Sequence, residues 1–456
     1  MVADRRDISV AEAERADAVG ARRILEPLLG GAGAAPAVRL WNGVTLEFGD
    51  GRPRCTLLIH DARVLRELIL TRDPLRLADA YVRGTVDVEG DFSDVLALKE
   101  HFAALRLRPS TKLALLARAL ALPRRAATAW PDACGRRWEA GSTLLKRSRR
   151  RDGQAIAFHY DVSNDFYRLW LDEQMVYSCA YFEQPDESLE RAQRNKLDLL
   201  CRKLRLTAGE RLLDIGCGWG ALLCWAAMHY GVEAHGVTLS RNQFDYTRRR
   251  IAEAGLGGRV SVELKDYRDI DEAGRFDKIA SVGMFEHVGL RNLPTYFSSA
   301  HRLLRDGGLF LNHGITHDRE GWPDSVGTRF INRYVFPDGE LDTVSNVQRA
   351  MERVGFEIWD VEGLRPHYAL TLRHWGERLE ARRREALGHV SPEVFRVWRL
   401  YMAACAHEFA QGGVGVYQIL ASKRAKAPPP VPLTRRDLYR ERVAGDRGPN
   451  QPRGGS

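Results

Sequence analysis

Residues 211–227, RLLDIGCGWGALLCWAA, decide the fold of this 456-residue chain. The first five residues are mostly apolar and predict a buried strand. Three glycines follow at alternate positions, Gly216, Gly218 and Gly220, and an apolar helix is expected to open at about Trp219. Glycine lets the backbone approach a ligand closely, and the first N–H groups of a helix lack partners within it. The sequence therefore predicts an α/β fold with a site for a nucleotide-like ligand.

Strands and helices are expected to alternate around this stretch, from Ala155 to about Lys423. Such alternation is typical of a mostly parallel sheet covered by helices. The strands that we place are 211–215, 234–239, 260–264, 276–282, 308–313, 356–362 and 414–422. Two helical segments, 370–387 and 393–410, are expected between the last two strands.

Five segments are predicted along the chain. Residues 1–37 form a helical and flexible segment, and 38–123 a small α+β domain, because apolar and polar residues alternate around turn signals. Residues 124–154 form a polybasic linker, and 155–423 the larger α/β domain. The tail 424–456, rich in proline, arginine and glycine, is expected to be disordered.

The net charge of +9 is concentrated in two of these segments. Residues 124–152 hold nine basic and three acidic residues, and residues 423–456 have the same counts. The rest of the chain is slightly acidic, which argues against a nucleic-acid partner. Basic strips suit an anionic membrane surface, where each basic residue contributes about 1 kcal/mol. A solvated hinge explains the linker equally well.

Cysteine usage and hydropathy narrow the class of protein further. Seven scattered cysteines form no C-x-x-C pair, so we expect reduced thiols and no metal site. The N-terminus lacks the apolar core of a signal peptide, and no run reaches the ~18 apolar residues that span a bilayer. We therefore expect a cytoplasmic protein that touches the inner face of the membrane peripherally.

The spacing of the glycine loop separates two ligand classes. Dinucleotide loops read G-x-G-x-x-G, whereas this loop reads D-x-G-x-G-x-G from Asp214 onward. The latter pattern resembles that of class I S-adenosylmethionine-dependent methyltransferases, in which the loop holds the methionine part of the cofactor. The sequence thus favours S-adenosylmethionine over a dinucleotide.

Two further segments offer groups for the rest of such a cofactor. The second strand ends in HGVTLSRNQ, where Thr238, Ser240 and Gln243 stand in place of the usual ribose-binding acid. Ser240 is also a good cap for the next helix, and both roles are compatible. After the third strand, Asp266 could accept the adenine amino group with Tyr267 packed on the ring. A plain surface turn is the alternative interpretation of Asp266.

The chain resembles the cyclopropane-fatty-acyl-phospholipid synthases and the mycolic acid cyclopropane synthases. The resemblance covers about 155–422 and rests on FHYDVSNDFY (158–167), YSCAYF (177–182), LLDIGCGWG (212–220), VTLSRNQ (237–243), GMFEHVG (283–289), NHGIT (312–316), PHYALTL (366–372) and YMAACAHEF (401–409). It implies a class I methyltransferase fold, with a Rossmann-like, mostly parallel sheet. The small N-terminal domain and the linker resemble the extra domain of the phospholipid-acting members.

The resemblance implies transfer of a methylene group from S-adenosylmethionine to the cis double bond of an unsaturated phospholipid acyl chain, forming a cyclopropane ring. It also implies a bound bicarbonate as general base, held by the backbone of Cys179 and Ile315 and by Glu286, His313 and Tyr368. The cofactor contacts that it implies are Tyr177, Ser178, Gly216, Gly218, Thr238, Leu239, Ser240, Gln243, Tyr267 and Arg268. The pattern of residues adds Asp214, Gly220 and Asp266 to them.

The chemistry of this reaction makes sense of the residue types. Attack by an alkene on an activated methyl group leaves a carbocation, so the pocket should exclude water and be lined by aromatic rings. Ring closure then needs a base that is a poor nucleophile, which suits bicarbonate better than a thiolate. The resemblance places Cys405 in the active site, although a buried structural thiol is the alternative. Aromatic candidates are Phe158, Tyr160, Phe166, Tyr167, Trp170, Tyr181, Phe182 and Phe285.

Other outcomes stay open at this point. Gly314 stands where many relatives carry threonine and Thr316 where they carry glycine, so the product could be a methyl branch or a methylene group. A methyltransferase that acts on a small amine or a free fatty acid is a second hypothesis. A nucleic-acid-binding protein is a third, without a helix-turn-helix or RNA-binding signature. The resemblance makes a homodimer plausible.

Overall fold

The computed structural model describes residues 18–32, 36–48, 52–90, 92–122, 162–321, 324–336, 339–426 and 430–439. The predicted linker 124–154 lies outside the described residues, as do Phe158 and Tyr160. The chain divides into two compact units. Unit 1 comprises Met1–Leu144, Asp324–Val335 and Val390–His407, and unit 2 comprises Leu145–Pro323, Phe336–His389 and Glu408–Ser456.

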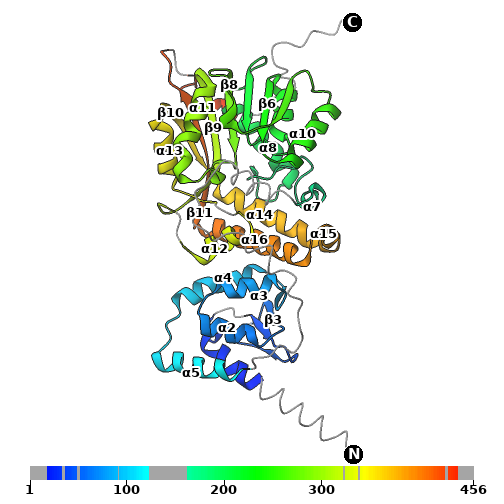
Figure 1. The fold of residues 1–456 in the computed structure, drawn as a ribbon, viewed down its shortest axis with the longest axis vertical. Helices are drawn as coiled ribbons and strands as arrows, with labels where there is room; N and C mark the ends of the chain where they lie inside the picture. Colours follow the sequence, from blue (N-terminus) through cyan, green and yellow to red (C-terminus); the bar gives the residue numbers. More distant parts are fainter. Residues whose placement is uncertain are drawn as a thin grey trace, which may run out of the picture. The chain divides into compact units, whose positions relative to one another are not determined.

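Unit 2 is built on a seven-stranded sheet in the order β10-β11-β9-β8-β5-β6-β7 (Figure 1). The neighbours from β9 to β7 are parallel, whereas β11 runs antiparallel to both β9 and β10. The strands are β5 (Arg211–Ile215), β6 (Glu233–Thr238), β7 (Val260–Leu264), β8 (Phe276–Val282), β9 (Leu304–His317), β10 (Phe356–Gly363) and β11 (Val414–Lys423). The mostly parallel sheet confirms the predicted α/β class, although β9 is longer than predicted at both ends.

Helices cover both faces of this sheet. Leu212 of β5 belongs to a core with helices α8, α9 and α10, whereas the next residue, Leu213, belongs to a core with α11 and α13. The alternation of strand side chains therefore feeds two apolar layers. The helices of unit 2 are α7 (Asn164–Arg168), α8 (Leu189–Lys203), α9 (Ala221–Tyr230), α10 (Arg241–Glu253), α11 (Leu293–Leu303), α13 (Val344–Arg353), α14 (Arg365–Ala381) and α15 (Arg383–His389), with short 3-10 turns η1 (Tyr267–Asp269), η2 (Phe285–His287) and η3 (Leu290–Asn292). The segment predicted as one helix at 370–387 is thus two helices that meet at Arg382.

Unit 1 contains a four-stranded sheet in the order β2-β1-β3-β4. The strands are β1 (Ala37–Arg39), β2 (Thr45–Leu46), β3 (Cys55–Ile59) and β4 (Val86–Gly90), and the helices are residues 18–29, α2 (Arg63–Thr71), α3 (Leu75–Val82), α4 (Phe92–Ala104) and α5 (Pro109–Ala121). Helix α12 (Val326–Tyr334) and most of α16 (Pro392–Gln411) complete the unit, although they fall within the predicted range 155–423.

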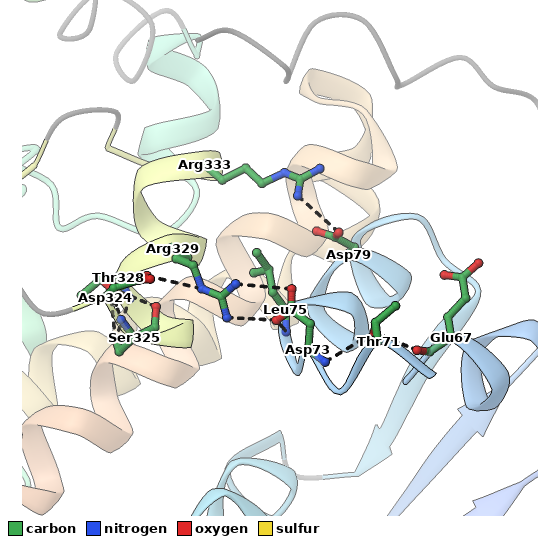
Figure 2. Close-up of polar contacts among 10 residues, drawn as sticks. All are labelled: Glu67, Thr71, Asp73, Leu75, Asp79, Asp324, Ser325, Thr328, Arg329 and Arg333. Atoms are coloured by element: carbon green, nitrogen blue, oxygen red, sulfur yellow. Dashed lines mark hydrogen bonds and ion pairs between the residues drawn. The ribbon is translucent and has the colours of Figure 1, made fainter. Parts of the chain in front are cut away.

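Ion pairs explain why α12 belongs to unit 1 (Figure 2). The guanidinium of Arg329 donates to both carboxylate oxygens of Asp73, at 2.9 and 3.3 Å. Asp79 of α3 is buried and accepts hydrogen bonds from the hydroxyl of Tyr334 at 2.6 Å and from Arg333 at 3.3 Å. A buried carboxylate needs such partners, so the contacts of Asp79 stabilise the packing of α3 against α12.

The end of the chain differs in part from the predicted disorder. Within the described residues 430–439, η4 (Arg436–Leu438) is a short 3-10 helix. Leu438 is buried, and its carbonyl accepts a hydrogen bond from Arg202 of α8 at 2.8 Å. One apolar anchor and an arginine therefore order a segment whose composition is otherwise polar. No helix within the described parts of the chain is long and apolar enough to cross a membrane.

Candidate active site

The glycine loop joins β5 to α9 as the sequence predicts. Gly216, Gly218 and Gly220 all have positive φ angles, of 79°, 54° and 78°. Gly220 is the N-cap of α9, and a Cβ atom there would lie within 3.3 Å of Thr247 side-chain atoms on α10. The loop therefore needs glycine both for its backbone conformation and for the close approach of α10.

A cavity opens at the carboxyl ends of β5, β6 and β8, the edge where ligands bind in open α/β sheets. Besides the glycine loop, its walls come from residues 175–178, from α8 and from the turn after β8. The predicted cofactor residues that line the cavity are Tyr177, Ser178, Asp214, Gly216, Gly218, Thr238, Leu239, Gln243 and Tyr267. The structure thus brings together residues from four separate motifs.

Thr238 and Gln243 form a buried polar pair on this wall. The Thr238 hydroxyl donates to Oε1 of Gln243 at 2.8 Å and accepts the backbone N–H of Ser240 at 3.2 Å. Ser240 is the N-cap of α10 and accepts the backbone N–H of Gln243. Ser240 therefore acts as the predicted helix cap and fixes the segment that carries Gln243.

Asp266 and Arg268 are paired with each other in η1. The carboxylate of Asp266 accepts the backbone N–H and Nε of Arg268, each at 2.9 Å, and also pairs with Nη2. The Asp266 carboxylate, which we expected to accept an adenine amino group, thus accepts hydrogen bonds from Arg268. Tyr267 between them lines the cavity and packs edge-on against Tyr296 at 5.6 Å between ring centroids.

A buried lysine that the sequence did not single out lies in the same wall. Lys196 of α8 is 2% exposed, lines the cavity and donates to the Ser178 hydroxyl at 2.8 Å. Burial lowers its pKa to about 8, opposed first by the negative charge of Asp172. Burial also raises the pKa of Asp214 to about 7, and Lys196 limits that rise. The two side chains therefore interact electrostatically in the cavity wall.

Aromatic rings form a buried cluster beside the cavity. Tyr177 lies 5.2 Å from Trp375 and 5.8 Å from Tyr167 between ring centroids, and Trp170 lies 5.5 Å from Trp375. Tyr167 and Trp170 are fully buried, as is Phe166. The ring of Trp219 in the glycine loop is tilted against that of Tyr167, with 4.9 Å between the centroids. Trp219 and Trp375 thus join the aromatic set predicted from the sequence.

Glu286 lies in η2, in the turn whose neighbours Gly283, Met284 and His287 line the cavity. Its Oε1 accepts the backbone N–H of Ile315 at 2.8 Å. Its Oε2 is buried and has no hydrogen-bond partner among the described residues. Burial raises the pKa of this carboxyl to about 7, although the bond from Ile315 opposes the rise. Glu286 is therefore a buried acid poised to exchange a proton near neutral pH.

His313 is buried on β9, two residues before Ile315, and its Nδ1 lies 3.1 Å from Nε2 of Gln418 on β11. Burial first, and then the charges of Lys196 and Lys203, hold its pKa well below the usual value. Its carbonyl accepts the N–H of Gly283 at 2.8 Å, which ties β9 to the turn that carries Glu286. The imidazole is thus neutral at neutral pH.

Cys179 and Tyr368 share a hydrogen-bond acceptor at the start of α14. The carbonyl of Leu364 accepts the Cys179 thiol at 3.8 Å and the backbone N–H of Tyr368 at 3.1 Å. Leu364 in turn donates to the carbonyl of Val416, which is paired with Ile315 in the sheet. Burial raises the pKa of the Cys179 thiol far above its usual value, so it stays protonated. Hydrogen bonds of Leu364 and Val416 therefore link the segments that carry Cys179, Tyr368 and Ile315.

Two other predicted features behave differently. A Cβ atom at Gly314 would overlap the ring of Phe285, so glycine is required at this position. Cys405 lies on α16, as predicted, but is only half-buried and belongs to unit 1. Its place in the active site stays a prediction. Among the described residues, no group of three His, Cys, Asp or Glu side chains is placed to hold a metal ion.

Comparison with known proteins assigns this site to a family. The family model described as mycolic acid cyclopropane synthetase matches residues 147–419. The chain belongs to this family. A second family model, described as a domain of unknown function, matches residues 31–104, which lie in unit 1.

Similar proteins of this cyclopropane synthetase family have related activities. A probable fatty acid methyltransferase of Pseudomonas putida is 40% identical over 407 residues, which covers 88% of this chain and 96% of that protein. Cyclopropane mycolic acid synthase 1 of Mycobacterium tuberculosis is 40% identical over 278 residues, 59% of this chain and 96% of that protein. The tuberculostearic acid methyltransferase UfaA1 of the same organism is 41% identical over 282 residues, 59% of this chain and 65% of that protein.

Solved structures of the family match as well. CmaA1, a mycolic acid cyclopropane synthase crystallised with S-adenosylhomocysteine and CTAB, is 37% identical with a TM-score of 0.57. The match covers 62% of this chain and all of that one. MmaA2 from Mycobacterium tuberculosis is 36% identical with a TM-score of 0.56, over 60% of this chain and 99% of that one. The chain has the class I methyltransferase fold and is an S-adenosylmethionine-dependent methyltransferase that acts on fatty acids.

Proposed function

We propose that this enzyme adds a methylene group across the cis double bond of an unsaturated phospholipid acyl chain, which produces a cyclopropane fatty acyl chain. S-adenosylmethionine, when bound, supplies the activated methyl group. The observation that carries the proposal is Glu286, a buried carboxyl with one oxygen unpartnered among the described residues, in a turn that lines the cofactor cavity. Such a group can hold the base that ring closure requires and can relay a proton near neutral pH.

The aromatic cluster supports the first step of this reaction. Attack by an alkene leaves a carbocation on the acyl chain, which water would trap. The buried rings of Tyr167, Trp170, Tyr177 and Trp375 keep water away, and their faces attract positive charge. The protonated thiol of Cys179 is a poor nucleophile, so it would not capture the cation.

The residues around Glu286 are compatible with a bound bicarbonate. The free oxygen of Glu286 provides one contact inside the protein, and we propose that His313 and Tyr368 provide others. The backbone N–H of Ile315 already donates to Glu286, so in this state it serves the ion only through that carboxyl. When bound, bicarbonate would supply a base that is a poor nucleophile. Glu286 and neutral His313 would orient it without adding net positive charge.

The substrate is proposed to be a phospholipid at the anionic, inner face of the cytoplasmic membrane, with the enzyme attached peripherally. The support is the concentration of basic residues in 124–152 and 423–456, whereas the rest of the chain is slightly acidic. Positive segments are attracted to the anionic headgroups of such a membrane. A homodimer is part of this proposal on the ground of family resemblance.

Mass spectrometry tests the proposed reaction directly. The purified protein is incubated with S-adenosylmethionine, bicarbonate and vesicles of a cis-unsaturated phospholipid, with saturated phospholipid and free fatty acid as parallel substrates. The expected result is an increase in acyl mass by one CH2 group on the cis-unsaturated phospholipid alone. Unchanged mass on every cis-unsaturated lipid would contradict the proposal, and modification of only the free fatty acid would contradict the phospholipid substrate.

A methyl-branched or methylene product is the second candidate. It is favoured by the similarity to a probable fatty acid methyltransferase over 88% of the chain and to a tuberculostearic acid methyltransferase. Proton NMR of the product separates the outcomes, because cyclopropane protons resonate apart from those of an alkene or a methyl branch. Olefinic signals from an added methylene carbon would replace the cyclopropane assignment.

A further inference from the structure

Helix α5 turns an apolar face to solvent. Leu113 and Leu120 are 70% and 52% exposed, and their separation of seven residues places them on the same side of the helix. Ala117 lies between them and is exposed as well. A single exposed leucine needs no explanation, but an apolar stripe along a helix marks an interaction surface.

The opposite face fixes this helix firmly in unit 1. Leu115 and Ala119 are buried, at 4% and 0% exposure, and Leu115 belongs to the core of the unit. Arg66 of α2 donates to the carbonyls of Ala119 and Leu120 at 3.1 and 2.9 Å, which caps the C-terminal end of the helix. The exposed leucines are therefore presented by a well-packed element.

The charge along α5 and the segments that flank it has one sign. From His101 to Pro131 the sequence contains no acidic residue but has six arginines and lysines, Arg106, Arg108, Lys112, Arg118, Arg124 and Arg125. The first four are exposed. Leucines flanked by cations suit a surface with anionic headgroups above and acyl chains below, because long basic side chains reach the headgroups while apolar ones enter the lipid.

A second copy of the chain fits this face less well. A two-fold interface brings the same patch of both subunits together, so the cations of α5 would face one another. An anionic lipid surface meets the same cations with opposite charge. We propose that α5 docks the enzyme on an anionic phospholipid bilayer, with Leu113 and Leu120 inserted among the acyl chains. This inference rests on the proposed function, because a phospholipid substrate lies in the bilayer.

Vesicle flotation with the full chain tests the docking face. Binding is measured on vesicles of phosphatidylglycerol with phosphatidylcholine and on phosphatidylcholine alone, for wild type and for the double variant Leu113→Glu/Leu120→Glu. The apparent Kd for anionic vesicles should rise by about tenfold or more, because the variant lacks the two leucines that insert into the bilayer. Met228→Glu on α9, where Met228 is also 52% exposed, is the matched control and should bind like wild type.

Three outcomes decide the inference. Weaker binding with an unchanged melting temperature, and with unchanged activity on detergent-dispersed phospholipid, supports it. Wild-type binding by the double variant overturns it, and so does a change of oligomeric state without a change in vesicle binding, since a second copy would then cover the face. The docking result is separable from the proposed function, because flotation needs no turnover, whereas the proposed function fails if wild type modifies no lipid in vesicles or detergent.

Discussion

The backbone N–H of Ile315 donates to Oε1 of Glu286 at 2.8 Å, across 29 positions of the sequence. This hydrogen bond joins the turn after β8 to the C-terminal end of β9 and leaves Oε2 as the free end of the carboxyl among the described residues. One oxygen is thus used for position and the other is available for chemistry. A substitution at Glu286 can therefore keep the hydrogen bond from Ile315 while it removes the titratable carboxyl.

Replacing Glu286 with glutamine should separate these two uses. Glutamine keeps an oxygen that can accept the Ile315 N–H but cannot exchange a proton near neutral pH, so turnover should fall by at least about 100-fold. The affinity for S-adenosylhomocysteine, measured by calorimetry, should stay at the wild-type value. Glu340→Gln is the control, because Glu340 also accepts a backbone N–H in this region, from Leu290 at 3.0 Å. Loss of cofactor affinity in Glu286→Gln would place Glu286 in the cofactor site instead.

The same variant should change how stability depends on pH. The pKa of Glu286 is raised from 4.5 to about 7 in the folded protein, so the fold favours the protonated acid. Its contribution to the free energy of unfolding is present below about pH 4.5 and is lost as the pH rises to 7. Glu286→Gln should therefore gain roughly 1–3 kcal/mol relative to wild type between pH 5 and pH 8. Urea unfolding across this range measures the difference, and parallel curves for the two proteins would contradict the raised pKa.

Gly314 should tolerate no side chain while Phe285 is present. A Cβ atom at position 314 would overlap the Phe285 ring, so Gly314→Ala should cost about 1–3 kcal/mol of stability and lower turnover, because the neighbouring Glu286 is displaced. The additional change Phe285→Leu should recover part of both losses. The control is Gly388→Ala in α15, where no atom lies within 4 Å of the new methyl group. Equal effects of the two single variants would show that the Phe285 contact is not the cause.

Local pattern was enough to predict the sheet and the glycine loop. The strands β5, β7 and β8 have the predicted bounds because apolar runs with clear turns define them. The long β9 was predicted too short, since its start depends on the pairing of Leu304 with Phe276 of β8, which is followed by a register shift before Leu309. The break between α14 and α15 at Arg382 has no proline or glycine to mark it.

Non-local contacts account for what the sequence analysis missed. The placement of α12 in unit 1 depends on ion pairs between residues more than 250 positions apart. The pairing of Asp266 with Arg268 is local, but the sequence does not say whether the Arg268 side chain turns to Asp266 or to solvent. A signal for Lys196 was present, because it follows Leu189, Ala192 and Gln193 along the buried face of α8, where a lysine is unusual.

Lys196 should prove important for cofactor binding and not for folding alone. Lys196→Met removes the donor to the Ser178 hydroxyl and the positive charge that interacts with Asp214 in the cavity wall. The Kd for S-adenosylhomocysteine, measured by calorimetry, should rise by about tenfold or more, since a buried polar group that loses its partner is costly. Lys203→Met is the matched control, because Lys203 is equally buried on α8 but pairs with Glu362 and Asp360 outside the cavity. It should lose stability and keep its affinity, and equal affinities in wild type and both variants would show that Lys196 only supports the fold.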